Sequence, residues 1–173
     1  MKSQEVYAAL KDHLAPLFQA AGFKRAKAML SWARPQQNSH LVVWFQVSQD
    51  GWDSYAGSKF TVEFQLSNEA IVGARHIHRQ RFPTMLDASG REEIRSIQNK
   101  VIASLRYPPA HHPPMQVSDL RSWYLKKFQK LDQPYGDKDD IWLRYGSRHD
   151  VTTWASFIAS KLPDCLLRAE SWG

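Results

Sequence analysis

The sequence predicts an α+β fold in which an antiparallel meander of about four to five strands packs against about four helices. Two observations predict this class. Apolar residues recur at helical spacing near both ends of the chain, whereas runs typical of strands lie at 28–33, 40–48 and 59–66. The connections between these runs are short and rich in turn formers, and a parallel crossover needs about a dozen residues or more. Consecutive strands are therefore expected to pair as antiparallel hairpins.

The composition fits one globular domain. Of the 173 residues, 43% are hydrophobic and 23% are charged. We expect one domain over 1–173, with a helix and sheet part at 1–82 and a helical part with a proline-rich connection at 83–173. The single cysteine, Cys165, excludes an internal disulfide and a cysteine-based zinc site, which favours a reducing, cytoplasmic compartment. The longest apolar run, at 41–45, is too short to span a membrane, so no membrane partner is expected.

The first predicted helix spans 3–21. Ser3 is of a type that caps helix starts, and Gly22 is of a type that ends them. Pro16 has no amide hydrogen and clashes with the preceding turn, so we expect a kink or a break near His13. The apolar residues that recur at helical spacing are Val6, Leu10, Leu14, Leu17 and Phe18.

The three strand candidates that follow differ in their patterns. In the third, apolar residues alternate with Thr61, Glu63 and Gln65, which is typical of a strand with one buried face and one wet face. The second contains the run 41–45, which is apolar on both faces. That run is therefore expected at the centre of the sheet, covered on each side.

One more strand is predicted at 71–77, and a helix follows it. Ser89 and Glu92 have the spacing of a capping box at a helix start. The proline-rich residues 107–114 cannot continue that helix and are expected to run extended over the surface. The apolar stripe of the helix consists of Ile94, Ile97, Val101 and Leu105.

The last third of the chain is predicted to contain two helices and a short strand. A helix is expected to begin near Ser118, and the run 141–145 could pair as a strand. Asp150 is placed to cap a last helix, and Pro163 is expected either to break that helix or to start a final turn. In the helix after Ser118, the residues expected inward are Leu120, Tyr124, Phe128 and Leu131, and those expected outward are Arg121, Lys126, Lys127 and Lys130.

No common catalytic signature occurs in the sequence, but two histidines are spaced as metal ligands can be. On a strand, His76 and His78 would point to the same face and could share a metal ion. A site would need a third ligand, such as His111, His112 or an acidic side chain. Exposed, partly basic strand residues explain the spacing better than a metal site does, so we expect no metal and no cofactor.

A basic stretch and two loop aromatics are the candidate binding residues. The stretch could form a phosphate-binding surface together with the basic helix near Lys126. Trp52 and Tyr55 lie in a loop of turn-forming residues, where large aromatics are available to a partner or could stack bases. Solvated basic faces are also common. The stretch contains Arg75, His76, His78, Arg79 and Arg81.

Four segments near the start of the chain share their order and spacing with a known family. They are 22–25, 30–34, 44–48 and 60–64. In this arrangement they resemble the bacterial family described as domain of unknown function 4304. The resemblance supports the fold and implies no activity. Its candidate functional residues would be Arg34, Gln46 and Ser48, although a polar side chain within a strand also serves to satisfy neighbouring backbone groups.

The leading hypothesis is a non-enzymatic module that binds another protein, of the immunity or accessory type in bacteria. It follows from the absence of a catalytic signature and from a surplus of aromatics, with seven Trp and eight Phe. The formal net charge of +6 favours an acidic partner. The alternative is a nucleic-acid-binding protein that uses the basic stretch and the basic face of the helix after Ser118. A second alternative is a metal-dependent hydrolase centred on His76 and His78.

Overall fold

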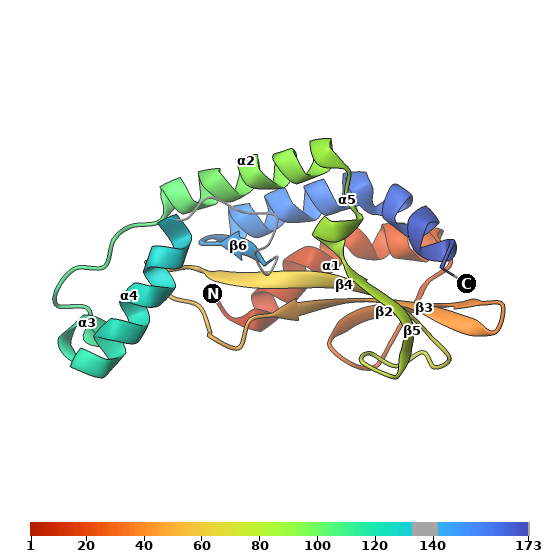
Figure 1. Cartoon of the computed structure of the whole chain (residues 1–173), viewed down its shortest axis with the longest axis horizontal. Coiled ribbons are helices and arrows are strands. Elements are labelled where there is room, and N and C mark those ends of the chain that lie inside the picture. Colours follow the sequence, from red (N-terminus) through yellow and green to blue (C-terminus); the bar gives the residue numbers. More distant parts are fainter. Residues whose placement is uncertain (133–141, 173) are drawn as a thin grey trace.

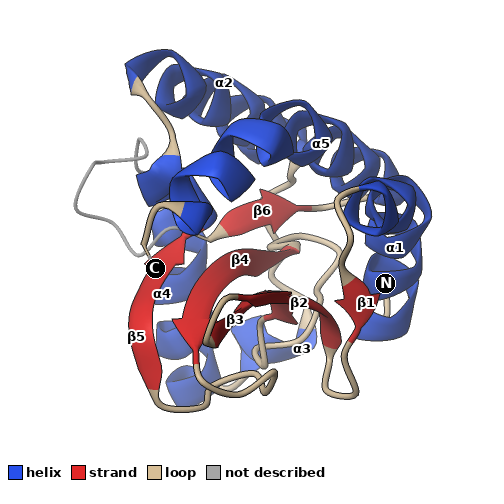
Figure 2. Cartoon of the chain, turned by 90° about the vertical axis from the view of Figure 1, so that its right-hand side faces the viewer, coloured by secondary structure: helices blue, strands red, loops and turns tan. Residues whose placement is uncertain are grey.

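Helices cover one face of a curved antiparallel sheet (Figures 1 and 2). The fold is that of a computed structural model, which describes residues 1–132 and 142–172, except for the side chains of 127–132. The elements are α1 (Ser3–Ala20), β1 (Lys24–Arg25), β2 (Leu30–Gln36), β3 (Ser39–Val47), β4 (Ser58–Ser67), β5 (His76–Arg81), the 3-10 helix η1 (Phe82–Met85), α2 (Ala88–Ser104), α3 (Pro113–Gln116), α4 (Ser118–Asp132), β6 (Leu143–Tyr145) and α5 (Arg148–Glu170).

The sheet confirms the predicted α+β class and the antiparallel meander. Within the described residues its order is β1-β2-β3-β4-β5, and every pairing is antiparallel. The short strand β6 pairs with the first residues of β4, whereas β5 pairs with the last ones. The helices α1, α2 and α5 lie together on one side of the sheet (Figure 2).

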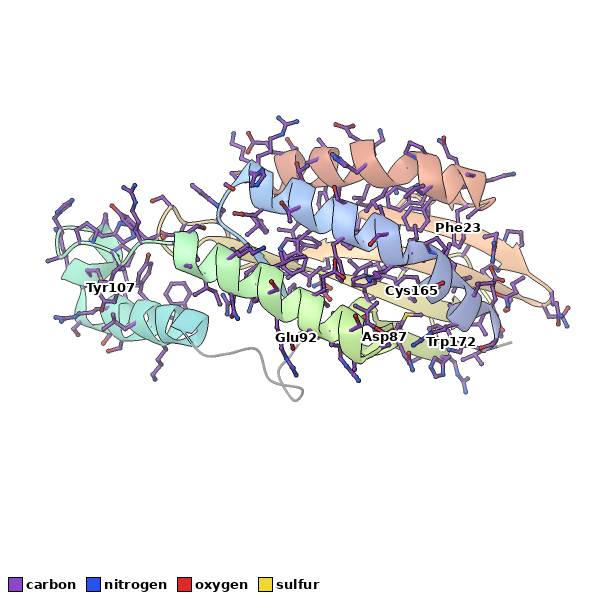
Figure 3. All side chains as sticks on the ribbon, turned by 90° about the horizontal axis from the view of Figure 1, so that it is seen from above. Phe23, Asp87, Glu92, Tyr107, Cys165 and Trp172 are labelled. Atoms are coloured by element: carbon purple, nitrogen blue, oxygen red, sulfur yellow. The ribbon has the colours of Figure 1, made fainter. Side chains whose placement is uncertain are left out.

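The main core lies between this helical layer and the sheet. The rings of Phe18 on α1 and Trp32 on β2 are stacked with their centroids 4.4 Å apart, which fixes the helix against the strand. Cys165 on α5 belongs to the same core (Figure 3). Burial raises the pKa of its thiol to about 12, so the thiol stays protonated at neutral pH.

The strand β3 is central and buried on both faces, as its sequence predicts. Val43 and Phe45 point into the main core, while Val42 and Trp44 form a separate apolar cluster on the opposite face. Because neighbouring side chains point to opposite faces of a strand, both faces of the sheet are covered here.

The prediction that one face of β4 is exposed to solvent is wrong, because the polar residues on that face are buried. Gln65 is fully buried and turns the loop that follows β4 onto the sheet: its amide nitrogen donates to the carbonyl of Ile71, and its amide oxygen accepts from the nitrogen of Gly73. Glu63 is buried beneath two arginines of β5. The polar residues on this face of the strand are Thr61, Glu63, Gln65 and Ser67.

The strand predicted at 71–77 is placed too early. The structure begins β5 at His76, and residues 71–73 form a turn. The contacts of Gln65 with this turn remove it from the sheet. Residues 78–81, which show no convincing period, pair with β4 instead.

Three helix boundaries differ from the expected ones. The first helix begins after Lys2, whose backbone nitrogen donates to Glu5 at 2.6 Å, and Ser3 is its first helical residue. The second begins after Asp87, whose carboxylate accepts from Gly90 at 2.7 Å, so Ser89 is no cap. The last begins after Ser147; Asp150 is its third residue and bonds back to the start of the helix.

The two helical prolines do not break their helices. The helix α1 continues through Pro16, and α5 continues through Pro163. The expected break near His13 is therefore wrong, as is the expected end at Pro163. Among the apolar residues at helical spacing in this first helix, Leu17 is 39% exposed. None of the described helices is long and apolar enough to cross a membrane.

Candidate functional site

The helices α3 and α4 form an arm at one end of the molecule, away from the helical layer (Figure 1). In Figure 3, Tyr107 marks this end, and Phe23 and Trp172 lie at the opposite one. Residues 110–112 form a turn, in which the nitrogen of His112 donates to the carbonyl of Pro109, and 113–116 form a one-turn helix, so the extended path predicted for 107–114 is wrong from 110 onward. A small apolar cluster around Ala56 and Tyr124 joins the arm to the body.

Asp53 is the polar centre of this junction. It lies in the loop between β3 and β4, where its Oδ1 accepts from the backbone nitrogens of Tyr55 at 2.8 Å and Ala56 at 2.9 Å. Such a turn is typical of aspartate, since its short side chain reaches the backbone two residues on. The same oxygen accepts from the hydroxyl of Tyr124 at 2.7 Å, and Oδ2 lies 3.1 Å from Nε2 of His112.

The junction changes the acidity of two of its groups. Partial burial acts to raise the pKa of Asp53, but hydrogen bonds from Tyr124 and from two backbone nitrogens, together with the charge of His112, lower it below its ordinary value. Burial, followed by the hydrogen bond and charge of Asp53, raises the pKa of Tyr124. At neutral pH the pair is therefore a carboxylate and a neutral phenol, which favours their hydrogen bond.

An apolar stripe lies on the arm. Val117 is 51% exposed, and Leu120 and Trp123 are each 50% exposed. Leu120 and Trp123 are three residues apart on α4, and Val117 directly precedes the helix, so the stripe lies at the helix start. Leu120 was predicted to face inward, and that prediction is wrong; Tyr124, also predicted inward, is buried. For Phe128 and Leu131 the prediction lies outside the described side chains.

Basic residues accompany the stripe. Arg121 and Lys126 are exposed on α4, as predicted, and Lys127 and Lys130 have side chains outside the described residues. Trp123 and Lys126 also line a hollow of about 340 Å³ between the arm and the body. The body side of the hollow is formed by Asp50, Ala56, Ser58, Lys59 and Arg144.

The basic stretch of β5 does not form one basic surface. The Nε atom of Arg79 lies 2.5 Å from a carboxylate oxygen of Glu63, and that of Arg81 lies 3.5 Å from the other oxygen. The guanidinium of Arg79 also lies 5.0 Å from the ring centroid of Trp44. These two arginines thus compensate a buried carboxylate.

The remaining residues of the stretch do not gather into a metal site. Arg75 and His76 are exposed, whereas the ring of His78 lies 4.3 Å from that of Trp172, between centroids. His112, a candidate third ligand, is paired with Asp53 instead. In the described ranges, no three histidine, cysteine, aspartate or glutamate side chains lie close enough together to hold a metal ion.

The two loop aromatics lie at the junction. Trp52 is 37% exposed, and its indole nitrogen donates to the carbonyl of Gly146 at 3.1 Å, directly after β6. The ring of Tyr55 meets that of His112 edge to face, with centroids 4.7 Å apart. Both rings therefore hold the loop in place beside the arm.

The three residues suggested by the resemblance have local partners. Arg34 bonds Glu170 and the carbonyl of Ala21, and so ties β2 to the ends of two helices. Ser48 donates to Asp50 in the loop after β3. Gln46 lies at the end of β3, half-buried, opposite Thr61. The structure does not bring these three residues into one site.

The sequence does not show that Asp53, His112 and Tyr124 meet at the junction. In the sequence, Asp53 has the surroundings of an ordinary turn residue. Its partners His112 and Tyr124 follow 59 and 71 residues later, so no local pattern connects them with it. The sequence does indicate the stripe, because Val117, Leu120 and Trp123 recur every three residues and add apolar side chains to those that one buried helix face would need. Comparison of the chain with protein-family models, with curated proteins and with solved structures found no match. The family resemblance therefore stays a prediction.

Proposed function

We propose that the protein is a non-enzymatic binding module and that the arm docks onto an acidic surface of another protein. The observation that carries this proposal is the stripe of Val117, Leu120 and Trp123, which is half-exposed at the start of α4, at the end of the molecule. Apolar side chains that share one helix side and stay in water are typical of a helix that binds in a partner's groove.

The composition of the stripe suits an interface. Tryptophan is among the residues that contribute most to binding when a partner buries them, and leucine and valine beside it add apolar area. Leu120 lies one helical turn before Tyr124, which the cluster beneath the arm buries, yet about half of each stripe side chain stays exposed and available to a partner. The stripe therefore has contact area to offer without unfolding of the arm.

The charges next to the stripe determine the chemistry of the partner. Arg121 and Lys126 are exposed on the same helix, and Asp119 is the acidic residue in its first turn. The whole chain carries a net charge of +6. Because complementary charge accelerates association and suppresses wrong partners, an acidic rim around an apolar groove is the matching surface.

Two observations make the alternatives weaker. A nucleic-acid surface on β5 would use Arg79 and Arg81, but both lie against the buried carboxylate of Glu63. A hydrolase centred on His76 and His78 would need further ligands, and the ring of His78 packs on Trp172. Neither observation bears on the arm.

Site-specific photo-crosslinking tests the proposal. A photoreactive amino acid is placed at Leu120, and the control chain carries it at Ser96, which is exposed on α2. We expect an acidic protein to be crosslinked from position 120 and not from 96, with less product at high salt. Equal products from both positions, or none from 120, would contradict docking through the arm.

A further inference from the structure

A second hollow lies on the face of the sheet away from the helical layer. The loops after β1 and after β4 are on that side of the sheet in Figure 2. Between them is a pocket of about 440 Å³. This is within the range of about 300–1,000 Å³ that small-molecule sites occupy. The pocket lies on a different part of the molecule from the arm. It shares no lining residue with the hollow between the arm and the body.

The interior of this pocket is apolar. Ala33 and Pro35 point to this face because they alternate along β2 with Trp32 and Arg34 of the helical side. The small side chain of Ala33 leaves room above the strand, and Val72 packs against the apolar cluster beside it. The apolar lining residues are Ala26, Ala28, Ala33, Pro35, Ala70, Ile71 and Val72.

Basic residues supply the charge of the pocket. Arg25 is held by the carbonyls of Ser31 and Met29, so its position is fixed from within the protein. Lys24 and Lys27 are exposed, and neither forms an ion pair with any acidic side chain of the described residues. His40 completes the basic lining, and its Nδ1 lies 3.2 Å from the carbonyl of Asn68. The described lining contains no aspartate or glutamate.

We propose that this pocket binds a small amphiphile with an apolar chain and one anionic head group. The chain would occupy the apolar interior, where it displaces water from alanine, proline and isoleucine side chains. The head group would lie at Lys24 and Lys27, whose ammonium groups bind an anion as point charges. Ile71, which is 55% exposed, would be covered by the chain.

Other ligand classes fit these residues less well. A neutral apolar ligand would leave the lysines without a role. A nucleic acid would need aromatic platforms for its bases, and the described lining has none. The pairing of an apolar interior with unpaired cations is therefore most complementary to an anionic amphiphile.

Binding of three probes to the full chain tests this inference. Dodecanoate has both the chain and the charge, dodecanol has the chain alone, and acetate has the charge alone. Calorimetry is expected to show binding of dodecanoate, binding weaker by about fivefold or more for dodecanol, and none for acetate. Equal affinity for dodecanoate and dodecanol would overturn the role of the lysines, and failure of dodecanoate to bind would overturn the proposal.

Two matched pairs of variants locate the site. Ile71→Asp adds a charge to the apolar lining and is expected to abolish binding of dodecanoate, whereas Ile77→Asp, at a residue 59% exposed outside the pocket, leaves it unchanged. The double change Lys24→Gln and Lys27→Gln is expected to lower the affinity of the protein for dodecanoate to its affinity for dodecanol. The same change at Lys11 and Lys100, on α1 and α2, is the control for net charge.

The variants also separate specific binding from detergent-like adsorption. Loss of binding in Ile71→Asp but not in Ile77→Asp, with unchanged circular dichroism in both, supports the pocket. If both variants or neither lose binding, dodecanoate associates elsewhere and the proposal is wrong. The arm has no part in this outcome, so the proposed protein-binding function stands or falls separately.

Discussion

The hydroxyl of Tyr124 on the arm donates a hydrogen bond of 2.7 Å to the carboxylate of Asp53, 71 residues earlier in the chain. This bond joins α4 to the loop between β3 and β4. Since the same carboxylate also holds the loop backbone and His112, one residue fixes both sides of the junction. The position of the apolar stripe relative to the body therefore depends on Asp53.

Removal of the Tyr124 hydroxyl is expected to loosen the arm. In Tyr124→Phe the carboxylate of Asp53 loses one donor, which costs about 1–2 kcal/mol of stability in the unit that contains the arm. Hydrogen exchange should increase in 113–126 and stay unchanged in β3. A double-mutant cycle with Asp53→Ala, which removes the acceptor, is expected to show non-additive effects, because both changes remove the same interaction. Strict additivity would contradict the pairing.

The stability of the junction is expected to fall in acid. The pKa of Asp53 is lowered in the folded protein, so its ionised form stabilises the fold above the ordinary value of about 4. This contribution is lost as the pH falls below about 4 and through the lowered folded value. Amide hydrogen exchange in the arm, corrected for intrinsic exchange rates, should become faster in the wild type as the pH falls below about 4. In Asp53→Asn the rise should be smaller, and an identical rise in both chains would show that Asp53 is not the titrating group.

Substitution of Glu63 tests the role assigned to the arginines of β5. In Glu63→Gln, Arg79 and Arg81 lose their shared anion, and we expect a loss of about 2 kcal/mol in the free energy of unfolding. The control is Glu92→Gln, since that side chain is 70% exposed and pairs with Arg95 on the helix surface. Chemical denaturation should show a loss of under about 0.5 kcal/mol there. Equal losses in both variants would contradict a structural role for Glu63.

Gly57 is expected to tolerate no side chain. A Cβ at this position would lie 2.4 Å from the carbonyl oxygen of Tyr145, and its φ is +62°. Gly57→Ala should therefore destabilise the protein by about 2–3 kcal/mol. Gly51 in the same loop has a φ of +75° with nothing within 4 Å, so Gly51→Ala should cost about 1 kcal/mol. Thermal melts that rank the two variants in reverse would contradict the contact between this loop and β6.

The strands were predictable where burial follows from the residues themselves. The run at 41–45 is apolar on both faces, and β3 is the central strand for that reason. The polar alternation of β4 was misleading because Gln65 and Glu63 are covered by partners from the next loop and strand. A single strand's pattern carries no information about such partners.

The candidate site was harder to predict because its parts are distant in sequence. His112 was identified as a possible metal ligand, and its real partner is a carboxylate in an earlier loop. The arm was predicted as a helix from Ser118 onward, but Leu120 was assigned to the wrong side. A helical period shows that apolar residues share a face and not which part of that face the body covers.

The affinity of the crosslinked partner for two leucine variants tests docking through the arm most directly. Leu120→Asp places a charge within the stripe, and Leu167→Asp makes the same change on α5, at a residue 65% exposed. We expect Leu120→Asp to weaken binding by about thirtyfold, since it removes an apolar contact and adds repulsion with an acidic partner. Leu167→Asp should leave the affinity unchanged. Wild-type affinity in Leu120→Asp, with the fold intact, would contradict the proposed function.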